Sequence, residues 1–238
     1  MVPDQTPFCG CSCLVRQHSN QPIHQTICSI LFRHRAAIED VVQWKKWSDE
    51  WHDIVRGIAL SIGESPEDTR VIGASKGSLI IILSGTLAFT KALSLITKYL
   101  ASIIKDILVI ANAIEDLQHK KILNKVVENN LEKQSEKLKI DGVKTILAEV
   151  KKALPNKLDG EQIQALERSI KKYLNFSDLG GDVDFVSPPE VHEDDEENED
   201  GKALNAVEIS EIRKIIHEVH SLRDEVKLLT HQEPDDAK

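Results

Sequence analysis

The stretch TRVIGASKGSLIIILSGT, residues 69–86, decides the fold class that we expect for this chain. Two short runs rich in valine and isoleucine flank Ser75-Lys76-Gly77, and a glycine in such a short link is typical of a β-hairpin turn. The second run, residues 79–83, is apolar at every position, as in strands that are covered on both faces. Because an isolated hairpin is only marginally stable in water, helices must pack on it. We expect this strand to lie beneath helices or to pair edge to edge with a strand of a partner protein.

A long helix is expected to follow the hairpin, from near Thr86 to about Lys139. Its first half, LAFTKALSLITKYLASIIKDILVIANAI at residues 87–114, is apolar almost all round. The polar side chains of this helix form a narrow stripe at seven-residue steps, at Lys91, Lys98, Lys105, Asn112 and His119.

Three interpretations of this apolar helix stay open: a central helix of the fold whose lysine stripe faces water, insertion into a membrane on triggering, and a permanent membrane span. A lysine at the bilayer centre costs about 2.5–3.5 kcal/mol, which favours the central helix. The residues that we expect to face protein or membrane are Leu79, Ile81, Leu87, Leu93, Ile96, Leu100, Ile103 and Ile107.

Further helices are expected on both sides of this segment. Before the hairpin, apolar residues at steps of three and four predict a helix that starts between Gln25 and Arg35 and ends at Ile62. Its predicted stripe runs through Ile38, Val41, Trp44, Ser48, Trp51, Val55, Ile58 and Ile62, and the helix holds all three tryptophans of the chain. Residues 140–175 are expected to form an αα-hairpin, whose second helix starts with the capping box Asp159–Gln162.

The end of the chain is predicted to be an acidic linker followed by a short coiled-coil helix. Residues 180–238 hold 18 acidic and 6 basic residues, and the run from Glu193 to Asp200 predicts a disordered segment within residues 176–203. In residues 204–231, apolar side chains step by 3, 4, 3, 4 and 3, which is the heptad period of a coiled coil, and β-branched residues at a with mostly leucine at d favour a parallel dimer. The predicted oligomerisation residues are Ile212, Ile215, Val219, Leu222, Val226 and Leu229, with Glu218 and Arg223 placed for an interchain ion pair.

The first 25 residues are expected to be a disordered leader ahead of a body at residues 26–139. All four cysteines of the chain, Cys9, Cys11, Cys13 and Cys28, lie in the first 28 residues. Thiolates can hold zinc or copper(I), but this spacing is not that of a zinc finger, so we expect neither a metal site nor a cofactor.

The hairpin and the helix after it carry a resemblance. The run Gly77-Ser78-Leu79-Ile80-Ile81-Ile82-Leu83, followed at once by a long helix of Ala, Leu, Ile and Lys, resembles a group of uncharacterised bacterial proteins over residues 71–117. The resemblance implies a compact α+β module and a bacterial cytosolic source. It implies no activity and no site residues.

The motifs and the charge of the chain argue against two classes of function. No Ser/His/Asp, Cys/His or paired-carboxylate pattern stands out, so we do not expect an enzyme. The chain carries a net charge of −9 and no basic stripe, which argues against nucleic-acid binding. We therefore expect an α+β, mostly helical, cytoplasmic protein that binds other proteins and itself, or a partner coiled coil. The alternative is a peripheral, membrane-active effector that inserts residues 86–114 into a bilayer.

Overall fold

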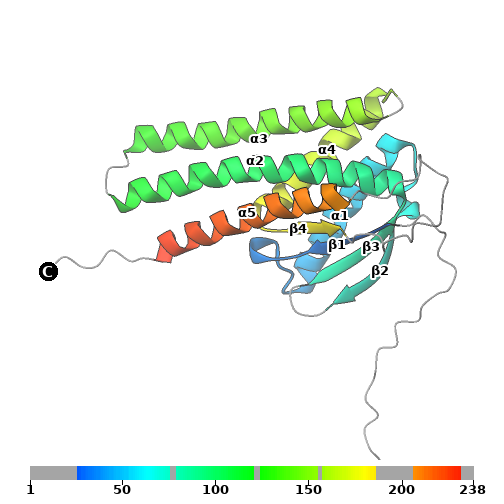
Figure 1. Ribbon diagram of the computed structural model, residues 1–238, viewed down its shortest axis with the longest axis horizontal. Helices are drawn as coiled ribbons and strands as arrows, with labels where there is room; N and C mark the ends of the chain where they lie inside the picture. Colours follow the sequence, from blue (N-terminus) through cyan, green and yellow to red (C-terminus); the bar gives the residue numbers. More distant parts are fainter. Residues whose placement is uncertain (1–25, 76–78, 121–123, 155–156, 186–205, 232–238) are drawn as a thin grey trace, which may run out of the picture.

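The computed structural model describes residues 26–75, 79–120, 124–154, 157–185 and 206–231. Its elements are β1 (Thr26–Leu31), α1 (Val41–Ile62), β2 (Arg70–Ser75), β3 (Ile80–Gly85), α2 (Leu87–His119), α3 (Lys125–Ala153), α4 (Gly160–Asp178), β4 (Asp182–Phe185) and α5 (Ala206–His231). Short 3-10 turns lie at His34–Ala36 and Pro66–Asp68. The expected fold class, α+β with mostly helices, is confirmed. Figure 1 shows α2 between α3 and α5, with the sheet beneath them.

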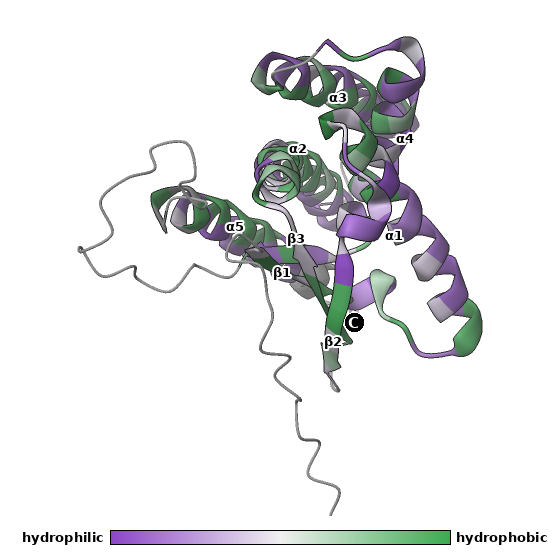
Figure 2. Cartoon of the chain, turned by 90° about the vertical axis from the view of Figure 1, so that its right-hand side faces the viewer, coloured by the Kyte–Doolittle hydropathy of each residue, from purple (hydrophilic) through white to green (hydrophobic). Residues whose placement is uncertain are grey.

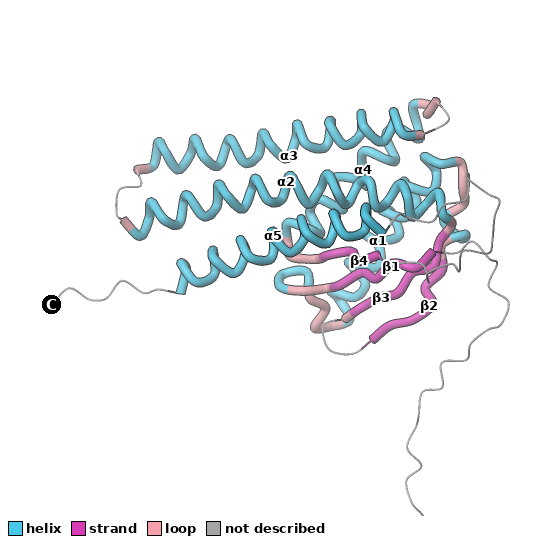
Figure 3. Tube along the Cα trace, in the orientation of Figure 1, coloured by secondary structure: helices cyan, strands magenta, loops and turns pink. Residues whose placement is uncertain are grey.

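The sheet is antiparallel with the strand order β2-β3-β1-β4 (Figure 3). The hairpin β2–β3 forms as the sequence predicts, although residues 76–78 of its turn lie outside the described residues. Edge pairing of residues 78–83 with a partner is wrong, because β3 already pairs with β1 on one side and with β2 on the other. The free edge on this side of the sheet belongs to β2.

Two strands come from segments that were expected to be something else. β1 occupies residues that we assigned to the start of a helix, and β4 lies inside the expected acidic linker at residues 176–203. In both strands the buried side chains alternate along the chain, at Cys28 and Ile30 and at Val183 and Phe185. Each strand is short, and its partners lie far away in sequence, so local pattern alone gives little sign of it.

Helix α1 begins later than expected and buries a different face. The Asp40 side chain accepts a hydrogen bond from the Gln43 N–H (2.8 Å) and so caps a helix that starts at Val41. Val41 is 81% exposed and Trp44 is 44% exposed, whereas Trp47 and Ile54 are buried. The predicted apolar stripe of this helix is therefore only partly correct, because its positions Val41 and Trp44 are exposed. The packed face of α1 turns toward α4 rather than toward the expected central helix.

The expected long helix to Lys139 is two antiparallel helices. Helix α2 ends at His119, and the Asn124 side chain accepts hydrogen bonds from the Val126 and Val127 N–H groups at the start of α3. The buried positions of α2 end at Ile107, and those of α3 begin at Gly142. The chain thus reverses beyond the packed core. The predicted αα-hairpin corresponds to the second half of α3 together with α4.

Helix α2 is the central helix of the fold. Eight residues were expected to face a protein partner or a membrane. Of these, Leu93, Ile96, Leu100 and Ile107 are buried within the chain, and Leu79, Ile81, Leu87 and Ile103 are half-buried. Insertion of residues 86–114 into a bilayer would remove this core. Within the described ranges, no helix combines the length and the apolar character needed to cross a membrane.

The lysine stripe of α2 is exposed at Lys91 as expected, but its next two lysines, which keep 46% and 43% of their side chains exposed, also meet α5. Lys98 and Lys105 form ion pairs with Glu211 and Glu218 of α5. Helix α5 therefore packs on its own chain, where Ile212 and Val219 are buried.

Candidate functional site

An apolar cavity of about 300 Å³ lies between α1 and the sheet. Figure 2 shows α1 on one side of β2, with α5 on the far side of the sheet. The volume lies at the lower end of the range for ligand pockets. Its walls are Ile30, Phe32, Ile38, Trp44, Trp47, Ser48, Trp51, His52, Val55, Pro66, Thr69, Val71, Ala74, Ile81 and Leu83.

One face of α1 supplies the tryptophan wall. The six lining residues from Trp44 to Val55 recur at helical spacing, so they share one side of the helix. Trp47 and Trp51 are 3% and 6% exposed, and each packs edge-on against Phe176 of α4 with ring centroids 5.1 Å apart. Trp44 is 44% exposed at the outer end. The wall is thus fixed at its inner end and open to solvent at its outer end.

The sheet supplies the opposite wall, and a β-bulge shapes it. Val71 pairs with Leu83 and Ala74 pairs with Ile81, with a register shift between Val71 and Gly73. In a regular strand, residues three apart point to opposite faces. The extra residue, Ile72, places both Val71 and Ala74 on the cavity side, which is the effect of a bulge on side-chain direction.

An ion-pair cluster holds the tryptophan helix against α4. Lys172 Nζ lies 2.6 Å from Asp53 Oδ2 and 3.3 Å from Glu50 Oε2. The hydrogen bond from Lys172 holds the pKa of Asp53 below its usual value. Burial alone would lower the pKa of Lys172, but the hydrogen bonds to the two carboxylates outweigh it and raise that pKa. Asp53 and Lys172 are therefore charged at neutral pH, and their ion pair joins α1 to α4.

The lining of the cavity is mainly apolar, with few polar groups. Its polar lining consists of Ser48, His52, Thr69 and the indole N–H groups, and no carboxylate or lysine lines it. The Nε1–H of Trp51 is buried and finds no hydrogen-bond acceptor among the described residues. An apolar cavity that is open to solvent and has an aromatic wall favours an apolar occupant, because such an occupant removes apolar surface from water.

The structure separates the residues that the sequence singled out. Ile81 lines the cavity, whereas Leu93, Ile96, Leu100 and Ile107 belong to the core of α2. Of the six predicted oligomerisation residues, Ile212 and Val219 are buried against the same chain, and Ile215 and Leu222 are half-buried. The side chains of Val226 and Leu229 lie outside the described part of the structure. Self-association through these residues stays a prediction.

The cysteines give no metal centre in the described chain. Cys28 is buried in β1, and burial raises the pKa of its thiol to about 12, so it is protonated at neutral pH. Cys9, Cys11 and Cys13 lie outside the described residues. Where side chains are described, no group of three or more His, Cys, Asp and Glu residues is placed to hold a metal ion.

The cavity between α1 and the sheet, which we call the tryptophan cavity, was not predicted from the sequence, although one signal pointed to it. The grouping of all three tryptophans on one helix marked an unusual aromatic surface, but the sheet wall depends on pairings between distant strands. In comparisons with known proteins, no family model matches the chain, and no curated protein or solved structure matches it either.

Proposed function

We propose that this is a non-enzymatic binding protein that holds an apolar segment of a partner protein in the tryptophan cavity. The observation that carries the proposal is the open aromatic cavity of about 300 Å³ between α1 and the sheet. Its wall is rigid, because Trp47 and Trp51 are packed against α4. A rigid binding surface loses little conformational entropy when it is occupied.

The surroundings of the cavity support a protein segment as the occupant. Among the residues that the structure describes, ten large apolar side chains are exposed, and half of them lie on β2 or on the first turn of α1. Val71 and Ile72 of β2 are 68% and 44% exposed. Trp44 and Val71 also line the cavity, so exposed apolar side chains adjoin it, and surface of this kind marks interaction sites.

The free edge of β2 gives such a segment a way to bind. In the sheet, β2 is hydrogen-bonded on one side only, to β3. An extended segment beside β2 would pair with its backbone and place alternate side chains into the cavity. Because the bulge interrupts the ladder at Ile72, we expect this pairing to involve mainly residues 73–75.

Tryptophan fluorescence tests the proposal directly, because the chain has three tryptophans and all three line the cavity. The probe is a soluble, lysine-flanked peptide with an apolar residue at every second position. We expect a saturable blue shift of the emission, mainly from Trp44, which is 44% exposed and loses water when the cavity is filled. The same peptide with aspartate at the apolar positions should give no shift.

Two matched variants locate the binding site. Ala74→Phe fills the cavity from the sheet side and should abolish the peptide-induced shift. Val109→Phe adds an aromatic ring at an exposed position of α2 outside the cavity and should leave the shift unchanged. If a small apolar dye shifts the emission and the peptide does not, the occupant is a small molecule and the proposed partner is wrong. If neither probe shifts it, the cavity is not a binding site.

A further inference from the structure

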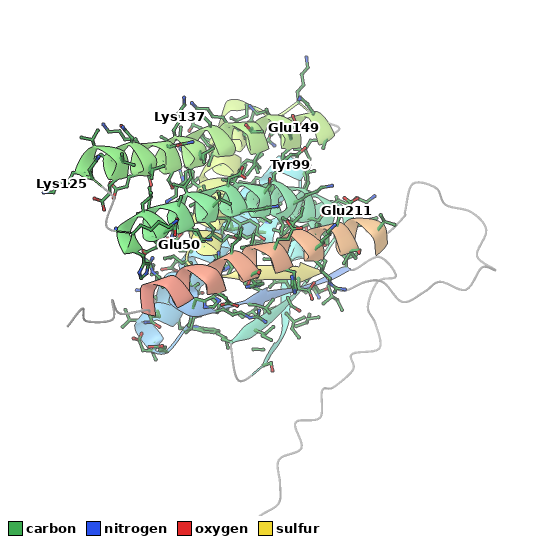
Figure 4. The ribbon with its side chains drawn as sticks, turned by 60° about the vertical axis from the view of Figure 1, so that its left-hand side comes forward. Glu50, Tyr99, Lys125, Lys137, Glu149 and Glu211 are labelled. Carbon is green, nitrogen blue, oxygen red and sulfur yellow. The ribbon has the colours of Figure 1, made fainter. Side chains whose placement is uncertain are left out.

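Two ion pairs join α5 to α2 at the same seven-residue step in both helices. Lys98 Nζ lies 2.8 Å from Glu211 Oε2, and Lys105 Nζ lies 2.6 Å from Glu218 Oε2. Figure 4 shows Glu211 on α5, on the side toward α2. Because the residue numbers rise together along both helices, α2 and α5 run parallel with the repeat of a two-stranded coiled coil.

The apolar stripe of α5 completes this seam. Ile209, Ile212 and Val219 are buried, and Val219 shares a small gap with Ala101 and Ile104 of α2. The heptads of α5 therefore make with α2 the kind of parallel contact that its sequence predicts for two copies of α5. We call the surface of α2 and β4 that holds α5 the seat, with Lys98, Lys105, Ala101, Ile104 and Asp184 as its defining residues.

The connection to α5 is much longer than its seat requires. Arg213 donates to the Asp184 carboxylate (2.8 Å) and to the Phe185 carbonyl (2.8 Å) at the end of β4. Arg213 lies seven residues into α5, about 10 Å from the start of the helix. The chain between them, residues 186–205, can span roughly 66 Å at about 3.3 Å per residue.

Such a connection leaves α5 open to competition. At the seat of its own chain, α5 has an effective concentration of about the millimolar range. A second copy of the chain at a similar concentration can therefore compete for that seat. Arg223 adds the same cost whether α5 sits on its own chain or on a second copy: it is 8% exposed and its Nη2 donates to the Ser177 carbonyl, but its Nη1 has no acceptor within the described part of the chain. Burying a guanidinium with an unpaired N–H is unfavourable.

We propose that α5 is an exchangeable helix and that the seat accepts the α5 of a second copy of this chain, giving a closed two-fold dimer by helix exchange. The dimer repeats every contact between α5 and the seat, so it needs no new surface. It places two tryptophan cavities on one particle. The proposal does not depend on what the cavity binds.

Two full-length variants with complementary charge test the exchange. The acidic-seat variant carries Lys98→Glu and Lys105→Glu, and the basic-helix variant carries Glu211→Lys and Glu218→Lys. Each variant alone sets like charges across its seat, whereas a heterodimer with exchanged helices pairs opposite charges at all four positions. The Kd of this heterodimer should be at least about 100-fold lower than that of the wild-type dimer. Native mass spectrometry should show monomers for each variant and a dimer in the equimolar mixture.

A control variant separates exchange from general charge attraction. Lys133→Glu with Lys137→Glu changes the net charge equally, but on the outer side of α3, where Figure 4 shows Lys137. Its mixture with the basic-helix variant should stay monomeric. If the acidic-seat mixture also stays monomeric, while both variants keep the wild-type tryptophan emission, the proposal is overturned.

A second measurement decides the question if the charge variants do not fold. Wild-type chains of ordinary and heavy isotope composition are mixed at rising concentration and examined by native mass spectrometry. Dimers of mixed mass, with a fraction that rises with concentration, are expected. Monomers alone up to millimolar concentration would show that α5 stays on its own chain.

Discussion

At the scale of single residues, Gly57 sets how closely α1 and α4 approach each other. A Cβ at this position would overlap Ser169 Oγ and lie 2.6 Å from the Ala165 carbonyl oxygen. The carbonyl belongs to the α4 backbone and cannot turn away. We expect Gly57→Ala to destabilise the fold by about 1–3 kcal/mol, measured by urea unfolding.

The matched control for this variant is Gly160→Ala, at the start of α4. Nothing lies within 4 Å of a Cβ at that position. Alanine there should be neutral or stabilising by up to about 1 kcal/mol, because it restricts the unfolded chain. Equal stability of the two variants would mean that the helices do not cross at Gly57.

The carboxylate of Asp53 ties the stability of the α1–α4 contact to pH. Its pKa is lowered in the folded chain by the hydrogen bond from Lys172. A lowered carboxyl pKa stabilises the fold above the unfolded value of about 4, and the effect is lost as the pH falls through the folded value. Asp53→Asn should therefore cost up to about 1 kcal/mol at pH 7 and almost nothing near pH 2. Urea unfolding at both pH values measures the difference, with Asp49→Asn, at an exposed position of α1, as the matched substitution.

At the scale of elements, the far ends of α2 and α3 form an arm beyond the core. Neither the last part of α2 after Ile107 nor α3 before Gly142 has a buried residue among the described positions. Val126 is 69% exposed. Helix hydrogen bonds with little tertiary packing open easily.

Hydrogen exchange should therefore divide α3 into two halves. Amides of residues 127–139 are expected to exchange at least about tenfold faster than those of residues 143–153, where Val143, Ile146 and Val150 are buried. The second half of the same helix is the internal control. Uniform protection along α3 would mean that another surface covers the arm in solution.

The sequence predicts an element well where the signal is local. The hairpin follows from a turn glycine between two apolar runs, and α4 follows from the capping box Asp159–Gln162, which the structure shows in both directions. The break between α2 and α3 was missed because residues 119–125, HKKILNK, contain neither glycine nor proline. The remaining signal was Asn124, a residue that favours N-caps.

The partner of an element is harder to predict than its type. The heptads of α5 predict a packed apolar stripe, and Ile212 and Val219 are buried, but the pattern does not state which helix lies across that stripe. The lysine stripe on α2 also carries information about the partner of α5. Lys98 and Lys105 are opposite in charge to Glu211 and Glu218 and have the same seven-residue spacing. The cavity could not be predicted from the sequence, because its sheet wall is formed by β1 and by the β2 bulge, and the local pattern predicts neither of them.

At the scale of the whole molecule, one core joins segments that the sequence assigned to separate regions. Buried residues of the sheet and of α1 to α5 belong to a single cluster. Tyr173 of α4 shares a 2.7 Å hydrogen bond with Thr97 of α2, and Phe176 contacts both Trp47 and Trp51. The body at residues 26–139 and the αα-hairpin at 140–175 therefore share their interior.

A shared interior predicts that these regions unfold in one transition. Two probes on different elements report on it: the tryptophans of α1, which pack against Phe176 of α4, and the buried thiol of Cys28 in β1. With Cys9, Cys11 and Cys13 changed to serine, Cys28 is the only thiol, and it should react with a thiol reagent only as the core opens. In urea, tryptophan emission, far-ultraviolet circular dichroism and thiol reactivity should give coincident midpoints. If residues 140–175 folded as a separate unit, circular dichroism would show a second step that the thiol does not follow, because Cys28 pairs only with β3 and β4 in the described sheet.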